Sequence, residues 1–278
     1  MHNPASTPPL PLGRDVSYPD AYDPKLLFPI GRAANRQSLR LPGPWFGADI
    51  WNAYEVSWLN KKGKPTAALA RYTVPQDSPR LIESKSFKLY LNSLNEERFE
   101  HAQAVRELMA RDLSQAAGAP VQVELTELSE LGRAASLPCL ALEGENIDGA
   151  DIEITAYEPA PELLRCVPDA QIVSETLVSD LLKSNCPVTG QPDWGSVQVR
   201  YTGPRIDREA LLAYIVSLRR HTEFHEHCVE KMYCDIWHAC RPQSLLVYAR
   251  YTRRGGLDIN PWRSSVAAQV GQDRNPRQ

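Results

Sequence analysis

Residues 183–195 read KSNCPVTGQPDWG and separate two segments that we expect to be strands, 171–182 and 196–202. Pro187, Gly190 and Pro192 interrupt this stretch, because proline fixes φ and glycine allows backbone conformations that other residues avoid. The stretch is therefore predicted to be a loop of fixed shape after an apolar strand, and such loops often carry chemistry. It places Cys186 before Asp193, which suits a nucleophile and its proton partner, although a lone cysteine can equally be an inert buried hydrophobe.

The chain after this stretch predicts two helices and a further strand. Residues 206–221, IDREALLAYIVSLRRH, have the composition of a helix, and Asp207 is placed to cap its start. A second helix is predicted from about Thr222 and must end before Pro242. The segment 244–252, SLLVYARYT, is then a strand.

The chain before residue 183 predicts a similar series of elements. The alternating residues 49–59, the polar turn NKKGKP and the segment TAALARYTV predict a hairpin. Residues 82–99 begin extended and become helical, a second helix follows and stops at Gly118, and strands are predicted at 121–128 and around residue 154. Each half thus reads as two strands, two helices and two strands, and the tripeptide RYT recurs at residues 71–73, 200–202 and 250–252. This order hints at an internal duplication.

Length and composition allow two domains of ordinary size. The chain has 278 residues, of which 42% are hydrophobic, and its first 45 residues hold nine of the 23 prolines. We read residues 1–45 as an irregular arm that wraps a surface, with a disordered tail as the alternative. Residues 46–150 then form a first module and residues 151–278 a second.

Charge and cysteine usage exclude several classes of protein. The net charge is −3, with 31 basic and 34 acidic residues and no basic stripe, which disfavours a direct nucleic-acid binder. Six cysteines show no CxxC pair, no N-terminal apolar run resembles a signal peptide, and no run is long enough to span a membrane. We therefore expect a cytoplasmic protein with reduced thiols and no membrane association.

Two further clusters carry groups suited to chemistry. In ESKSFKLY, residues 83–90, Glu83, Ser84 and Lys85 fall where an extended segment becomes a helix, so unpaired N–H groups there can meet a phosphate or a base, unless the segment is only a solvated face. In HTEFHEHC, residues 221–228, His221 and His225 have the spacing of a helical zinc pair, as do Glu223 and His227. His225 and Glu226 could instead recognise a polar ligand, or the segment could be a capped helix start.

A third cluster, RRGGLDINPWR at residues 253–263, joins arginines to glycines. Glycine lets the backbone approach an anion while guanidinium groups neutralise it, although RGG can also be a plain hairpin tip. No GxGxxG or GxxxxGK[ST] motif occurs, so a nucleotide here is not held by a Rossmann or P-loop device.

Together these clusters make the chain resemble, over essentially its full length, the NADPH-dependent 7-cyano-7-deazaguanine reductases of the queuosine pathway in their long, two-module form. All eight positions from Glu83 to Tyr90 fit the diagnostic segment of that family, and SNCPVTGQPDWG, the His, Glu pair and RRGG fit its second module. The resemblance implies an α+β tandem tunnelling fold (T-fold), in which each of two modules is an antiparallel sheet with two helices on one face. It further implies a homodimer, with the substrate held between modules, that contributes to tRNA modification.

The resemblance also implies a mechanism and a set of site residues. The Cys186 thiolate attacks the nitrile carbon of 7-cyano-7-deazaguanine to give a covalent thioimide, Asp193 protonates the nitrogen, and two hydrides from NADPH give the aminomethyl product. The residues implied to bind the substrate are Ile82, Glu83, Ser84, His225 and Glu226. Those implied to bind NADPH are Ser84, Lys85, Arg254 and Gly255, and no metal is expected.

Two other functions remain open at this point. A zinc-dependent cyclohydrolase-like or pterin enzyme of the same fold would use Cys186 with His221 or His225 as metal ligands. A non-catalytic nucleobase-binding or RNA-binding module would bind tRNA in a salt-sensitive way without oxidising NADPH.

Overall fold

The computed structural model describes residues 21–131 and 139–278, in an α+β fold whose strands form one large sheet and one two-stranded sheet. The order across the large sheet is β6-β3-β2-β11-β10-β9-β8-β7, with β5 beside β2, and β1 pairs with β4 separately. The strands are β1 (Pro29–Gly31), β2 (Phe46–Asn60), β3 (Pro65–Pro75), β4 (Arg80–Ile82), β5 (Arg98–Phe99), β6 (Gln122–Glu127), β7 (Glu145–Asn146), β8 (Ile172–Asn185), β9 (Pro192–Pro204), β10 (Ser244–Tyr251) and β11 (Leu257–Ser264).

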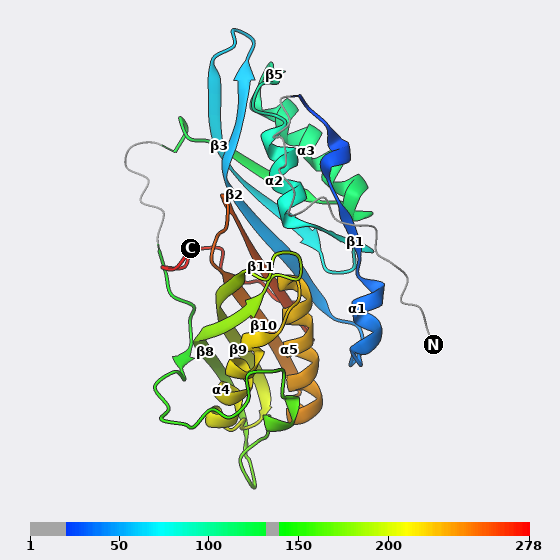
Figure 1. The fold of residues 1–278 in the computed structure, drawn as a ribbon. Helices are drawn as coiled ribbons and strands as arrows, with labels where there is room; N and C mark the ends of the chain where they lie inside the picture. Colours follow the sequence, from blue (N-terminus) through cyan, green and yellow to red (C-terminus); the bar gives the residue numbers. More distant parts are fainter. Residues whose placement is uncertain (1–20, 132–138) are drawn as a thin grey trace.

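The large sheet contains three antiparallel hairpins, β6 and β10 pair with β3 and β9, and one long-range pairing joins the two halves of the chain. The hairpins are β2–β3, β8–β9 and β10–β11, each closed by a polar or glycine-containing turn. The long-range pairing sets β11 antiparallel to β2, with Ile259 opposite Trp51, so strands from the two halves of the chain lie side by side (Figure 1). The sheet therefore runs without a break from one half of the chain to the other.

Five helices accompany these strands in the described part of the chain. They are α1 (Ala33–Ser38), α2 (Ser84–Asn92), α3 (Ala102–Ala117), α4 (Arg208–Ser217) and α5 (His225–Cys240), with short 3-10 turns at Pro24–Leu26, Pro161–Leu163 and Leu218–Arg220. The predicted cap is confirmed, since the Asp207 carboxylate accepts hydrogen bonds from the backbone N–H groups of Glu209 and Ala210. Gly118 ends α3 in the left-handed conformation, φ 76°, as glycine does at many helix ends.

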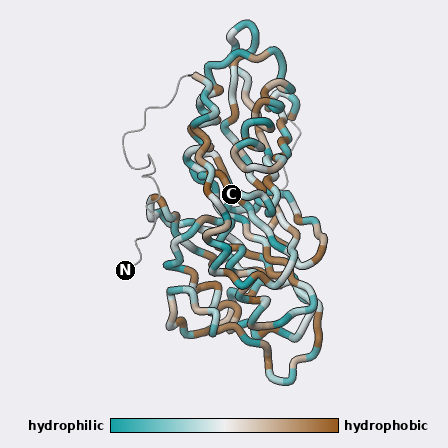
Figure 2. The backbone as a smooth tube through the Cα atoms, turned by 90° about the vertical axis from the view of Figure 1, so that its right-hand side faces the viewer, coloured by the Kyte–Doolittle hydropathy of each residue, from teal (hydrophilic) through white to brown (hydrophobic). Residues whose placement is uncertain are grey.

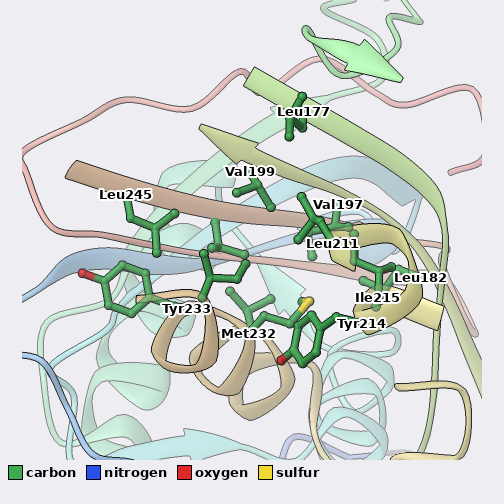
Figure 3. Close-up of a cluster of buried hydrophobic side chains, with 14 of the residues drawn as sticks. Leu177, Leu182, Val197, Val199, Leu211, Tyr214, Ile215, Met232, Tyr233 and Leu245 are labelled. Atoms are coloured by element: carbon green, nitrogen blue, oxygen red, sulfur yellow. The ribbon is translucent and has the colours of Figure 1, made fainter. Parts of the chain in front are cut away.

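Two apolar cores lie on the helix-bearing face of the sheet. One is packed beneath α2 and α3, and the other joins α4 and α5 to β8, β9 and β10. Figure 3 shows the second core, where Met232 of α5 and Tyr214 of α4 lie on the helix side of Val197 and Val199 of β9. Figure 2 shows that the tip of the β2–β3 hairpin is by contrast hydrophilic.

Strand β11 shows that both pairs of helices cover the same face. Alternate residues of a strand point to the same side, and here Leu257 and Ile259 belong to the core under α2 and α3. Arg263, four residues after Ile259 and so on the same side, bonds to Glu230 of α5. The N-terminal starts of α2 and α5 can therefore face one another across the middle of the sheet.

The structure corrects three predictions about elements. The strand expected around residue 154 is absent from the described residues: Ile152 packs against the core, but residues 151–156 form no ladder. The helix expected from about Thr222 begins at His225, because residues 221–223 hydrogen-bond to Asn185 instead. The loop predicted at 183–195 is shorter, since β8 extends to Asn185 and β9 begins at Pro192.

The described part of the N-terminal arm, residues 21–45, contains short elements. It includes β1 and α1, and it crosses from the α2 side of the molecule to the α5 side (Figure 1). Leu27 and Arg32 within it are buried, so this segment contributes to the interior as well as wrapping a surface. Residues 1–20, which the arm prediction also covers, lie outside the described residues.

Among the helices described, none has both the length and the apolar character needed to cross a membrane.

Candidate active site

One cavity of about 330 Å³ lies where the starts of α2 and α5 meet the β8–β9 and β10–β11 turns. Its walls come from five separate segments of the sequence, including Trp51 of β2. Every residue singled out from the sequence as catalytic, substrate-binding or cofactor-binding lines it: Ile82, Glu83, Ser84, Lys85, Cys186, Asp193, His225, Glu226, Arg254 and Gly255. The clusters that the sequence presents separately are therefore brought together by the fold.

The β8–β9 turn holds Cys186 and Asp193 toward the same cavity. Ser184 is paired with Asp193, and Cys186 lies two residues beyond Ser184, so the two side chains share one side of the hairpin. The Cys186 N–H donates to the Gln191 carbonyl at 2.9 Å, and the Gly190 N–H donates to the Cys186 carbonyl at 2.9 Å. Gly190 has φ 68°, which explains the glycine at the turn. The thiol is only partly buried and is open to a ligand in the cavity.

Asp193 is held as a carboxylate. Its side chain, 4% exposed, bonds to the Arg254 guanidinium through Oδ1 and lies 3.3 Å from His225 Nε2 through Oδ2. Burial would raise the pKa of Asp193, but the hydrogen bonds and charges of His225 and Arg254 outweigh burial and hold that pKa below its usual range. In the free site Asp193 is therefore a proton acceptor at neutral pH.

The start of α5 is fixed to the Cys186 turn. The Asn185 N–H donates to the His221 carbonyl at 2.7 Å, and the Glu223 N–H donates to the Asn185 carbonyl at 3.0 Å. These bonds tie the residue before Cys186 to the segment just before His225. The His225 ring also stacks on Tyr251 of β10, with ring centroids 3.9 Å apart and planes 12° apart, so both its position and its orientation are restrained.

Glu226 and Glu83 supply two buried carboxyl groups to the cavity, each 2% exposed. Burial and the nearby Asp49 charge raise the pKa of Glu226, and the charges of Arg32 and Arg263 offset this only in part. Glu83 caps α2, accepting hydrogen bonds from the N–H groups of Lys85 at 3.0 Å and Ser86 at 2.7 Å. Because two carboxylate oxygens offer about four acceptor positions, Glu83 keeps capacity for donors of a ligand.

Cationic side chains border the cavity beyond Glu83. Lys85 and Lys88 lie one helical turn apart on α2 and both line the cavity, with Lys88 Nζ 3.7 Å from Glu55. Gly255 adopts φ 57°, and a Cβ there would come within 2.5 Å of Lys88 Nζ, so the turn and the lysine depend on glycine. This donor set fits the phosphates of a dinucleotide. Arg254, predicted to face phosphates, here bonds to Asp193 and Gln191.

The histidines predicted as an alternative zinc site take different partners. His225 faces Asp193, while His227 Nδ1 contacts Asn35 and lies 3.3 Å from Glu223. Within residues 21–131 and 139–278, no three His, Cys, Asp or Glu side chains are grouped so that they could hold a metal ion. The spacing of His221 and His225 therefore does not produce a metal-binding geometry in the described structure.

Three residues important to the site were not singled out from the sequence. Lys88 follows Lys85 by three positions, a helical spacing that could have identified it as part of the same cationic face. Tyr251 lies in a repeated RYT tripeptide, yet its stacking on His225 depends on tertiary structure. Asp49 affects Glu226 only because β2 lies next to β11, and no local signal indicates that pairing.

Two family models match separate parts of the chain, and curated relatives match nearly all of it. Residues 18–125 match the model described as "Nitrile reductase, 7-cyano-7-deazaguanine-reductase N-term", and residues 192–269 match the model described as "QueF-like protein". The NADPH-dependent 7-cyano-7-deazaguanine reductase of Bordetella pertussis is 58% identical over 271 residues, covering 96% of this chain and 98% of the relative. The enzyme of the same name from Albidiferax ferrireducens is 54% identical, with the same coverages.

Among solved structures, the crystal structure of the archaeosine synthase QueF-Like in the apo form matches at 17% identity with a TM-score of 0.31. The match covers 37% of this chain and 100% of that one. A similarity this low supports no conclusion about the fold.

Proposed function

The chain belongs to the family of NADPH-dependent 7-cyano-7-deazaguanine reductases, and from this premise we propose how its own residues carry out the reaction. The enzyme reduces the nitrile of 7-cyano-7-deazaguanine to an aminomethyl group with NADPH, a step of queuosine biosynthesis. The observation that carries the proposal is the placement of a thiol, an ionised carboxylate and two buried carboxyl groups in one cavity.

In the proposed first step, Asp193 accepts the proton of the Cys186 thiol, and the thiolate sulfur adds to the nitrile carbon. The carbon–nitrogen triple bond becomes a double bond, and the nitrogen takes the proton back from Asp193, giving a thioimide. Because its pKa is lowered, Asp193 is ionised in the free site and can accept the proton. The restraint of Asp193 by His225 and Arg254 keeps its proton within reach of the growing negative charge on nitrogen.

The substrate is proposed to bind between Glu83 and Glu226, with His225 and the backbone of Ile82 and Ser84 beside it. The pyrimidine edge of a deazaguanine presents N–H donors, and buried carboxylates discriminate strongly for such donors because a base without them leaves the acceptors unpaired. Binding of those donors favours the ionised form of Glu226, whose pKa is raised in the free site.

NADPH is proposed to contact Ser84, Lys85, Arg254 and Gly255, with Lys88 as a further cation on the same face of α2. Two NADPH molecules, bound in turn, would each supply one hydride, and with uptake of protons and release of the Cys186 thiolate the thioimide becomes the amine. The chain's residues orient the cofactor through phosphate contacts: Lys85 and Lys88 offer ammonium groups, and the Gly255 turn lets the backbone come close.

The larger organisation is proposed on the same basis. An arm of residues 1–45 and modules of residues 46–150 and 151–278, each a T-fold unit, would associate into a cytoplasmic homodimer that acts on the free base and not on nucleic acid. The α+β architecture and the helices on one face of an antiparallel sheet support this proposal.

Replacement of the thiol tests the proposed chemistry. Cys186→Ala is expected to abolish substrate-dependent oxidation of NADPH, followed by its absorbance, because no other group in the cavity can form the thioimide. The matched control is Cys139→Ala, since Cys139 is exposed and does not line the cavity. Wild-type enzyme should consume two NADPH per substrate, as should the control, and full turnover by Cys186→Ala would rule out the mechanism.

A further inference from the structure

The two sides of the substrate cavity come from different halves of the chain. Ile82, Glu83 and Ser84 lie at the end of β4 and the start of α2, whereas His225 and Glu226 begin α5. Binding of a ligand between Glu83 and Glu226 therefore depends on the distance between the starts of two helices that are far apart in the sequence. The N-terminal arm contacts both of them.

The arm first contacts the Glu83 side. The Glu83 N–H donates to the Phe28 carbonyl at 2.9 Å, and the Phe28 N–H donates to Ser86 Oγ at 3.0 Å. Strand β1 continues this contact by pairing with β4, with Pro29 opposite Ile82. The backbone on both sides of Glu83 is thus bonded to the arm.

The arm then contacts the Glu226 side through α1. The Asn35 side-chain amide bonds to Nδ1 of His227, the residue after Glu226. Arg36 makes a two-pronged ion pair with Glu230, Nη2 to Oε1 at 2.6 Å and Nε to Oε2 at 3.1 Å. Because Glu230 lies one helical turn after Glu226 on the same side of α5, this ion pair restrains the first turns of that helix.

Buried ion pairs fix the middle of the arm to the sheet. Arg32, 1% exposed, bonds to Asp49 of β2 and to Ser78, the latter at 3.2 Å. Asp49 lies 2.9 Å from Arg263 of β11, which in turn lies 2.7 Å from Glu230. Breaking a buried ion pair leaves an uncompensated charge, so this cluster holds the arm in one place.

From these contacts we infer that the arm segment from Phe28 to Arg36 is a positioning element for substrate recognition, setting the spacing between Glu83 and Glu226. The inference rests on the proposed function of those two carboxyl groups. Asn35 and Arg36 line no part of the cavity, so they act through α5 and not by touching the substrate.

The test compares Arg36→Ala with Arg106→Ala in the full-length enzyme. Arg106 is an exposed arginine of α3 that bonds to Gln103 of the same helix, and it is a matched control. Arg36→Ala is expected to raise the KM for 7-cyano-7-deazaguanine about tenfold, equivalent to about 1.4 kcal/mol, while kcat and the KM for NADPH stay within about twofold. Arg106→Ala should change none of the three. Arg36→Lys, which keeps the charge opposite Glu230, should recover part of the loss.

A double-mutant cycle separates positioning from general destabilisation. Substrate affinity is measured by calorimetry in the Cys186→Ala background, which prevents covalent capture, with and without Glu226→Gln. The effect of Arg36→Ala should disappear when Glu226 is already replaced. An undiminished effect, or equal rises of KM for both substrates, would overturn the inference.

If Arg36→Ala does not fold, Asn35→Ala is measured in the same cycle, because it removes only the contact to His227. Different results would contradict the proposed function and the role of the arm. Wild-type enzyme without nitrile reduction would contradict the proposed function, whereas an active enzyme in which Asn35→Ala and Arg36→Ala behave like Arg106→Ala would contradict the arm inference alone.

Discussion

Glu83 and Glu226 are equally buried at the starts of two helices, yet their surroundings differ. Glu83 receives two backbone N–H bonds from its own helix, so local structure defines its position. Glu226 begins α5, whose N-cap residue Phe224 makes no side-chain capping bond. Burial and the Asp49 charge raise the pKa of Glu226, and Arg32 and Arg263 from other elements offset this in part. One carboxyl group caps its own helix as well as facing the cavity, whereas the pKa of the other depends on its burial and on charges from other elements.

The largest expected effect that tests this difference is on substrate affinity. Glu226→Gln should weaken binding of 7-cyano-7-deazaguanine by roughly 10- to 150-fold, because a hydrogen bond to a charged group contributes about 1.5 to 3 kcal/mol. Glu83→Gln should weaken binding to a similar extent. Calorimetry in the Cys186→Ala background measures both, and an unchanged affinity in either variant would remove that residue from substrate recognition.

A smaller effect on stability should separate the two residues. Glu83→Gln is expected to lower the free energy of unfolding by about 1 kcal/mol, as the loss of a helix cap does. At pH 8, Glu226→Gln should leave the free energy of unfolding unchanged or raise it, because the substitution removes a buried carboxyl group that is not an N-cap. Denaturant unfolding of the ligand-free variants gives both values, and equal losses would show that the distinction between the two sites is wrong.

The pH dependence of stability gives a third and more specific test. The pKa of Glu226 is raised in the fold, so its stabilising contribution is complete below 4.5 and is lost as pH rises above that value. The pKa of Glu230 is lowered to about 2, because the charges and hydrogen bonds of Arg263, Arg36 and Arg32 outweigh burial. Its contribution is present above 4.5 and is lost as pH falls toward 2.

Unfolding curves of Glu226→Gln and Glu230→Gln, measured from pH 2 to above pH 4.5, test the direction of both pH dependences. Relative to wild type, Glu226→Gln should gain stability as pH rises above 4.5, whereas Glu230→Gln should lose most of its disadvantage as pH falls toward 2. Parallel pH curves for wild type and both variants would contradict these charge assignments.

Much of the local structure could be predicted because its causes are local. The Asp207 cap, the Gly118 helix end and the hairpin through residues 60–65 follow from residue types at fixed positions. The residues that line the cavity were likewise identified, but from their resemblance to a family and not from spacing alone. Periodicity was misleading near residue 154, where alternating burial persists without a neighbouring strand.

The remaining features depend on long-range contacts. Nothing near Asp49 indicates that β2 pairs with β11 or that Arg32 and Arg263 meet there. The stacking of Tyr251 on His225 and the bonding of Asn185 to residues 221–223 arise in the same way. These contacts determine the charge and the position of the site residues, so sequence patterns reveal the functional groups more readily than their arrangement.

The central claim is that Cys186 bonds to the nitrile carbon after Asp193 takes its proton. Intact-protein mass spectrometry of enzyme mixed with 7-cyano-7-deazaguanine, without NADPH, tests it directly. Wild type should gain the mass of one substrate, Asp193→Asn should do so much more slowly, and Cys186→Ala should gain nothing. A wild-type enzyme that turns over without any adduct, or an adduct on Cys186→Ala, would contradict the claim.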